Sequence, residues 1–316
     1  MIVSCQGLEL SEGLLRVSKA ISNKIANPIL EGIKIIAEED TLIMSATDTE
    51  LTIEKKIKAE VRQEGETVVP GRFITEFVKK LTNTQIELEV NDKNQLTIRY
   101  EDSESVIQCY NPVEYPGFKN VESKEYFGIS QKDFKTCVNK SIFAVALDDS
   151  RPILKGVLFD INNNELNVVA LDGYRLARVK KTIKSNMTKS IVVPARSLNE
   201  LSKMIEDSDE IINIYVGEYT IMADLGDTKV TSRLLEGDYI NYKQIIPVNF
   251  ETFVIVNKEQ FEQALERATL LSRASSSNYV KFDIKESNLC ITSNSELGNL
   301  KAVSYTHLTL PTTSRV

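Results

Sequence analysis

The sequence predicts an α+β fold in which one domain, with two helices packed on antiparallel sheet, is repeated along the chain. Two observations support this prediction: short motifs return at a fixed spacing, and helix-like apolar patterns alternate with pairs of strand-like segments. The chain has 316 residues, enough for two or three domains, and its 42% hydrophobic and 26% charged residues are typical of a globular protein.

Three pairs of segments share one offset of 124 residues. They are residues 28–33 and 152–157 (PILEGI and PILKGV), 46–51 and 170–175 (ATDTEL and ALDGYR), and 68–72 and 192–196 (VVPGR and VVPAR). Three matches at one offset indicate two copies of a single domain, which we predict at residues 1–122 and 126–247.

A third copy begins but does not finish. Residues 289–296 resemble residues 166–174 at an offset of 123 and follow another amphipathic helix, but no third VVP-x-R segment comes after them. We therefore predict a partial third domain at residues 248–303. Residues 304–316 match nothing in the other copies and are expected to be a foreign or frame-shifted, non-native end; a divergent natural tail is the alternative.

The helices follow from apolar stripes of helical period. They are predicted at residues 11–24, 71–81, 131–141, 196–207 and 257–273. Ser11, followed by Glu12, resembles the N-cap of the first helix, where a hydroxyl can accept a bond from a free backbone amide.

The strands are predicted as hairpins between these helices. Residues 42–44 and 51–53 flank a turn at Asp48, and residues 166–170 and 175–179 flank Asp172-Gly173, a dipeptide that favours tight turns. Further strand pairs are residues 85–90 with 96–98, and 211–216 with 219–223.

The net charge of −7 excludes a uniformly basic nucleic-acid binder but not a local basic face. Within the predicted limits the five helices carry a net charge of +5, which leaves −12 for the rest of the chain. The functional interpretation is a set of helices that face phosphates without reading sequence. The alternative is chance placement of solvated charges.

Several classes of protein are disfavoured. One histidine, His307, leaves little scope for histidine-based catalysis or metal binding, and the common nucleotide-binding and nucleophile motifs are absent from the sequence.

The four cysteines are scattered, so we expect free thiols in a reducing cytoplasm, with no metal site and no cofactor. Apolar runs are too short to span a membrane, and the first residues do not resemble a signal peptide. Turn positions explain Asp48, Glu50 and Asp172 without catalysis.

Taken together with residues 27–30 (NPIL), 69–73 (VPGRF), 170–177 (ALDGYRLA) and 237–242 (GDYINY), these features make the chain resemble a known family. It resembles the beta subunit of bacterial DNA polymerase III, the sliding clamp, over roughly residues 1 to 300. The resemblance implies a DNA-clamp fold and a head-to-tail, ring-shaped homodimer around duplex DNA. It also implies a processivity factor that tethers the polymerase and catalyses nothing itself.

The resemblance further implies partners and sites. The partners would be double-stranded DNA, a second copy of the chain, the polymerase III alpha subunit, the clamp loader and other proteins with a clamp-binding motif. The DNA-contacting residues would be Lys24, Arg72, Arg151 and Arg196. The pocket for clamp-binding peptides would be formed by Leu154, Leu171, Gly173, Tyr174, Arg175, Leu176, Ile240 and Ile245.

Simpler interpretations remain open for these residues. Core packing could explain each aliphatic side chain, and a solvated surface charge could explain each basic one. A repeat-domain scaffold for protein interactions that never encloses DNA is the alternative function. Because the third copy lacks its second helix, we expect weakened ring closure, with the chain a monomer or an aggregate in solution.

Overall fold

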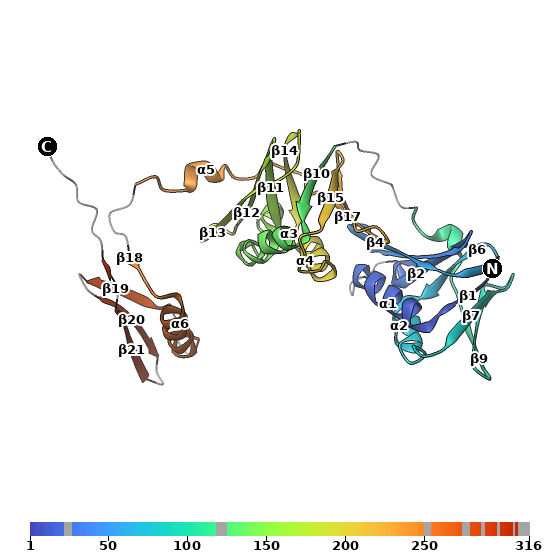
Figure 1. Cartoon of the computed structure of the whole chain (residues 1–316). Helices are drawn as coiled ribbons and strands as arrows, with labels where there is room; N and C mark the ends of the chain where they lie inside the picture. Colours follow the sequence, from blue (N-terminus) through green and yellow to red (C-terminus); the bar gives the residue numbers. More distant parts are fainter. Residues whose placement is uncertain are drawn as a thin grey trace. The chain divides into compact units, whose positions relative to one another are not determined.

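The structure is a computed structural model that describes residues 1–21, 27–117, 125–249, 254–273, 279–285, 288–295, 298–305 and 307–308. Its contacts divide the chain into two compact units, Met1–Ile240 and Asn241–Val316 (Figure 1). The first unit holds the first two sequence repeats, and the second holds the start of the third. The four domain limits predicted above stay predictions.

The first copy alternates strands and helices from its first residues. Its elements are β1 (Ile2–Gln6), α1 (Gly7–Val17), β2 (Gly32–Glu38), β3 (Thr41–Thr47), β4 (Leu51–Lys58), β5 (Glu60–Gln63), β6 (Gly65–Pro70), α2 (Gly71–Val78), β7 (Gln85–Val90), β8 (Gln95–Tyr100) and β9 (Ser103–Gln108). Short 3-10 turns lie at Ser18–Ala20, Pro28–Glu31 and Pro112–Glu114.

The second copy repeats this order. Its elements are β10 (Tyr126–Ser130), α3 (Gln131–Asn139), β11 (Gly156–Asn162), β12 (Glu165–Leu171), β13 (Leu176–Thr182), β14 (Thr188–Pro194), α4 (Ala195–Met204), β15 (Ile211–Val216), β16 (Thr220–Asp224) and β17 (Thr228–Arg233), with 3-10 turns at Ile142–Ala144 and Pro152–Lys155. In place of β5, Gly128 and Lys184 form an isolated bridge. The predicted α+β class, with two helices on antiparallel sheet, is confirmed for both copies.

The second unit resembles the first half of a copy. It holds α5 (Tyr242–Ile245), β18 (Val254–Ile255), α6 (Lys258–Ser272), β19 (Lys281–Lys285), β20 (Asn288–Ser295), β21 (Gly298–Tyr305) and β22 (His307–Leu308). β22 pairs with β18 as β5 pairs with β1, so residues of the predicted non-native tail occupy a place that the repeat provides. Whether that tail is native stays untested.

One sheet of the first unit is shared by both copies. Its eight strands run in the order β10-β15-β16-β17-β4-β3-β2-β6, and the two copies meet where β17 pairs antiparallel with β4. A five-stranded sheet (β5-β1-β7-β8-β9) completes the first copy, and a four-stranded sheet (β13-β12-β11-β14) completes the second.

The helices of each copy pack as a pair, α1 with α2 and α3 with α4; in the view of Figure 1 the strands of the second copy rise above α3 and α4, while β1, β7 and β9 of the first copy lie beside α1 and α2. Leu10, Leu14 and Val17 form the buried stripe of α1. The packing is close: a Cβ on Gly13 would lie 2.2 Å from the terminal methyl of Met44 in β3. Buried side chains form one continuous core from Met1 to Val230.

The predicted N-cap of the first helix is wrong. α1 begins at Gly7, directly after β1, and Ser11 lies buried within the helix. The Gly7 amide donates a hydrogen bond of 2.9 Å to the Thr84 carbonyl, and a Cβ at Gly7 would lie 2.0 Å from the Leu81 carbonyl oxygen. The chain therefore changes from strand to helix at a glycine, because only a residue without a Cβ can lie this close to the Leu81 carbonyl. By contrast, Ser130 and Asn257 do cap α3 and α6 through their side chains.

Candidate nucleic-acid interface and peptide pocket

Helix α1 of the first copy and helix α4 of the second copy line a common cleft. The cleft, of about 230 Å³, is lined by Leu15, Arg16, Lys19, Glu200, Lys203 and Met204. Three of these six side chains are cations and one is an anion. Leu15 and Met204 supply the apolar part of the lining. A basic cleft of this kind suits a phosphate backbone.

Arg196 opens α4 and reaches across to the first copy. Its guanidinium contacts the Asp48 carboxylate, and its Nη2 donates a 3.4 Å hydrogen bond to the Lys19 carbonyl oxygen. Only 8% of the Asp48 side chain is exposed, against 44% for Arg196. The predicted DNA contact therefore also joins the two copies.

The other predicted DNA contacts lie apart from this cleft. Arg72 is exposed in the first turn of α2, and Arg151 is exposed just before the 3-10 turn Pro152–Lys155. Neither lines the cleft between α1 and α4. Lys24 lies outside the described residues.

Arg16, Lys19 and Lys203 were not singled out from the sequence. Their charges were counted in the predicted helices, but nothing local indicates that α1 and α4 lie side by side. Only the pairing of β17 with β4 brings the two helices together.

The expected net charge of +5 for the five helices is corrected by the observed helix limits. Within α1, α2, α3, α4 and α6 there are eight basic and eight acidic side chains, because Glu9 joins α1 and several lysines fall outside the helices. Those lysines follow the helices: Lys19 after α1, Lys79 and Lys80 after α2, and Lys140 after α3. Positive charge at a helix C-terminus is favoured by the helix dipole, which explains this placement in part.

The predicted peptide pocket centres on the turn from Asp172 to Arg175, which joins β12 to β13. Leu171 pairs with Leu176, so four residues connect the strands, one position further along the chain than the four left between the predicted strands. Asp172 Oδ1 accepts hydrogen bonds from the amides of Tyr174 (2.9 Å) and Arg175 (3.1 Å), and Gly173 has a φ of +94°. These amide bonds, with the Arg175 side chain, hold the pKa of Asp172 below its usual value of 3.8.

The same turn occurs in the first copy. Asp48 Oδ1 accepts from the amides of Glu50 (3.1 Å) and Leu51 (2.8 Å), and Thr49 has a φ of 79° where the second copy has glycine. An aspartate that caps its own turn explains why the motif recurs.

The pocket residues differ greatly in exposure. Leu154 and Leu171 are 2% exposed, which supports the core-packing interpretation for both, whereas Tyr174 is fully exposed. Arg175 is exposed, Leu176 and Ile240 are half-buried, and a Cβ on Gly173 would meet no other atom within 4 Å. Ile245, 51% exposed, belongs to α5 in the second unit.

Two exposed apolar residues of the second copy were missed. The Arg175 guanidinium carbon lies 5.8 Å from the centre of the Phe143 ring, which is 58% exposed. Leu147 is 86% exposed and follows Ala146, whose amide donates to the Leu154 carbonyl at 2.9 Å. Phe143 therefore lies beside Arg175, next in the chain to the exposed Tyr174. No sequence motif marks Phe143 or Leu147, because only the fold brings their turn beside β12.

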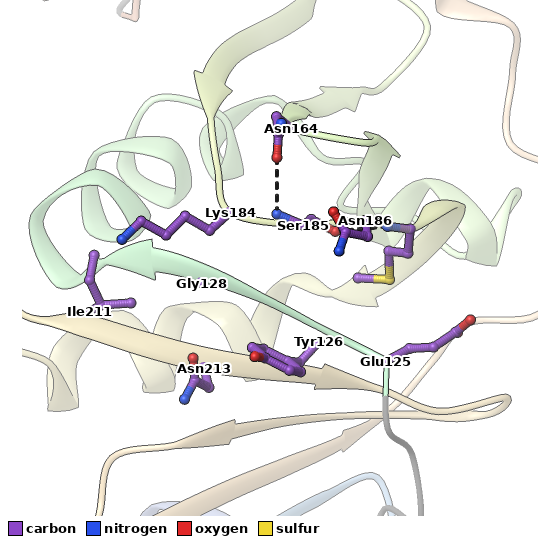
Figure 2. A pocket seen from close by; sticks show the side chains of 10 residues that line it. Glu125, Tyr126, Gly128, Asn164, Lys184, Ser185, Asn186, Ile211 and Asn213 are labelled. Atoms are coloured by element: carbon purple, nitrogen blue, oxygen red, sulfur yellow. Dashed lines mark hydrogen bonds between the residues drawn. The ribbon is translucent and has the colours of Figure 1, made fainter.

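A separate cavity of about 550 Å³ lies where the second copy lacks a counterpart of β5 (Figure 2). It is lined by Glu125, Tyr126, Gly128, Asn164, Lys184, Ser185, Asn186, Met187, Ile211 and Asn213. The Asn164 side-chain oxygen accepts a 3.3 Å bond from the Ser185 amide and holds the loop that forms one wall. None of the predicted site residues lines it.

The described part of the chain contains no group of three or more His, Cys, Asp or Glu side chains placed to hold a metal. The four cysteines are free and buried. Burial raises the pKa of Cys5 to about 12 and that of Cys137 to about 11, so both thiols stay protonated at neutral pH. No helix in the described residues has the length and apolar character needed to cross a membrane.

Comparison with known proteins identifies the family. Three family models match in order: the DNA polymerase III beta subunit N-terminal domain at residues 1–119, the central domain at 128–241 and the C-terminal domain at 243–301. A beta sliding clamp from Halalkalibacterium halodurans is 37% identical over 81% of this chain and 71% of its own length. One from Bacillus subtilis is 34% identical over 92% of this chain and 80% of its own length.

Solved structures agree with this assignment. The DNA polymerase sliding clamp from Bacillus subtilis superposes with a TM-score of 0.94 and 32% identity, over 98% of this chain and 84% of that one. A DNA polymerase III beta subunit structure from Eubacterium rectale gives the same TM-score at 29% identity. The repeated α+β copies, the motifs at fixed spacing and these relatives lead to one conclusion: the chain belongs to the DNA polymerase III beta subunit family, the beta sliding clamps.

Proposed function

We propose that the chain is one subunit of a head-to-tail homodimeric ring that encircles duplex DNA and tethers the replicative polymerase to it. As a member of its family, the chain is an accessory processivity subunit and not a catalyst. The observation that carries the ring is the pairing of β17 with β4. It joins consecutive copies edge to edge, and one repeated head-to-tail contact of this kind builds a ring when its rotation closes.

The proposed inner surface carries the helices. The cleft between α1 and α4 supplies Arg16, Lys19 and Lys203, while Arg72, Arg151, Arg196 and Lys24 are proposed as further phosphate contacts. Contacts with phosphates do not depend on the DNA sequence and weaken with salt, so the ring can stay around duplex DNA and still slide along it. The acidic remainder of the chain disfavours DNA on other surfaces.

The proposed partner site is the exposed patch of the second copy. We define this patch as the exposed Tyr174, Phe143 and Leu147 with the Arg175 guanidinium, which contacts Phe143; the combination suits a short apolar peptide with an acidic or carbonyl group. We propose that the polymerase III alpha subunit, the clamp loader and other proteins with clamp-binding motifs dock here, with Leu154 and Leu171 supporting the patch from below. The proposed location is the cytoplasm.

Retention on DNA tests the proposal by topology. The clamp loader and ATP would be used to load the labelled chain onto nicked circular plasmid, and gel filtration would then separate bound from free protein. A ring co-elutes with the circle and is released after a single cut, because it slides off the ends. Linear plasmid with both ends blocked by bound protein is the control and should retain the ring. The alternative scaffold function predicts equal binding to circular and cut DNA, and that result would refute encirclement.

A further inference from the structure

The β17–β4 contact provides a template for how copies join. Lys229 of β17 lies opposite Glu54 of β4, and both side chains point away from the core and are half-buried. The neighbouring residues of β17 and β4, Val230 and Ile53, lie opposite each other and are buried. Within the paired segment, the outer row of β17 holds Lys229 and Thr231 and that of β4 holds Glu54 and Thr52, so each outer row carries one charge there.

β9 is the first copy's counterpart of β17. Both strands follow a two-residue hairpin with a positive φ at its first residue, +49° at Glu101 and +84° at Gly226. This alignment places Glu104 where β17 has Lys229. β9 is an edge strand of its sheet in the described structure, and Val106 on its outer row is 57% exposed.

β21 is the third copy's counterpart of β4. Thr47 pairs with Thr52, and Asn294 pairs with Asn299 at the same separation along the chain, although in the third copy the ladder continues by one more pair, Ser295 with Gly298. This alignment places Lys301 where β4 has Glu54, and Leu300 where β4 has Ile53. Leu300 packs on the small core of the third copy, Lys301 is exposed, and β21 is likewise an edge strand of its described sheet.

The signs of the two charges are therefore reversed between the joined edges (β17 and β4) and the open edges (β9 and β21). The joined edges have lysine on the β17 side and glutamate on the β4 side, whereas the open edges have glutamate on β9 and lysine on β21. Glu104 also lies in an acidic cluster, since Arg99 binds it at 3.0 Å together with Glu87 and Glu89. Arg62 also binds Glu87, at 2.8 Å, so three carboxylates share two guanidinium groups and leave a net negative charge beside the open edge.

We propose that Glu104 and Lys301 determine which strand edges join, by pairing β9 of one chain with β21 of a second copy in the register of β17 on β4. This inference rests on the proposed ring and adds to it the residues that select the partner edge. In the correct assembly both contacts place opposite charges face to face. If β9 docked on β4, Glu104 would face Glu54, and if β17 docked on β21, Lys229 would face Lys301. Opposite charges stabilise such cross-strand pairs and like charges destabilise them.

A cysteine reporter detects the pairing even when association is weak. Val106→Cys and Asn299→Cys occupy the positions equivalent to Thr231 and Thr52, which lie opposite each other in the template. The native cysteines are buried and provide little background. The full chain with both reporters would be oxidised mildly, and the rate of covalent dimer formation followed on non-reducing gels.

Charge variants of the reporter chain then test whether Glu104 and Lys301 control the rate at which the covalent dimer forms. Glu104→Lys alone and Lys301→Glu alone should each slow dimer formation by about 3-fold or more, since each places like charges face to face. The double reversal should restore the rate to within about 2-fold, which also shows that the substitutions leave the strands folded. Lys281→Glu, on β19 of the same three-stranded sheet, is the matched control and should have little effect. High salt should reduce the differences between variants.

The outcomes separate this inference from the ring itself. Equal rates for all charge variants, with dimers formed, would overturn the sorting role of Glu104 and Lys301 and leave the ring intact. No covalent dimer from the reporter chain with its natural charges would overturn both the pairing and the proposed ring.

Discussion

Replacing Ile53 by alanine tests whether the β17–β4 contact stabilises the first unit as one body. Ile53 has no exposed surface, pairs with Ala46 on one side and lies opposite the buried Val230 on the other. The substitution removes three carbon atoms, and at about 0.8 kcal/mol for each it costs roughly 2.4 kcal/mol before any cavity is counted. Incomplete collapse around the site adds to this, so we expect a loss of about 3 kcal/mol.

The assay is urea denaturation of the full chain followed by circular dichroism. Because one continuous core runs from Met1 to Val230, Ile53→Ala should lower the midpoint of the transition that unfolds both copies together. Val113→Ala is the matched control, since Val113 is 84% exposed and its truncation should change stability by at most about 0.5 kcal/mol. A loss below about 1 kcal/mol for Ile53→Ala, or unfolding of the second copy at an unchanged midpoint, would refute the reasoning.

Three further predictions concern the sites. Lys19→Gln and Lys203→Gln in the cleft between α1 and α4 should each weaken DNA binding and reduce the slope of log affinity against log salt by about 1, measured by fluorescence anisotropy over a salt series. Leu147→Ser should weaken the binding of a clamp-binding peptide about 10-fold in the same type of assay, because it removes exposed apolar area from the proposed partner site. The pKa of Asp172, followed by NMR titration, should lie below 3.8 and should rise in Arg175→Gln while staying below 3.8, because the variant keeps the Tyr174 amide, which is the largest cause.

The sign of the last prediction extends to stability. The pKa of Asp172 is lower in the folded state than in the unfolded state. Ionised Asp172 therefore stabilises the folded protein above the unfolded pKa near 3.8, and this stabilisation is lost as the pH falls through the folded-state pKa. Acid should therefore loosen the turn that presents Tyr174. An unchanged Tyr174 amide resonance through this titration would contradict the capping role.

The DNA and peptide predictions have their own controls. Lys93→Gln, in the exposed β7–β8 turn of the five-stranded sheet, should leave DNA affinity unchanged. Tyr219→Ala, 55% exposed in the same copy, should leave peptide affinity unchanged. An effect of either control as large as that of the site variants would mean that the assay reports net charge or general stability rather than the site.

Local features of the fold were predictable because local chemistry decides them. The Asp172 turn forms through hydrogen bonds to its own next amides, and its recurrence at Asp48 made the repeat visible in the sequence. The helices were found from their apolar stripes, although their ends were not. Ser11 has the side chain of a good N-cap, but tertiary packing starts the helix four residues earlier, at Gly7.

By itself, therefore, the sequence determined the repeated α+β domain, its turns, its family and the residue types available at each site. Tertiary structure alone decided which edges join, and through that the cleft between α1 and α4, the contact of Arg196 with Asp48 and the reversed charges on β9 and β21. The physical reason is separation along the chain. Strand edges that lie far apart in the sequence, such as those of Ile53 and Val230, pair through backbone groups that every residue carries, so no local pattern marks which edge meets which.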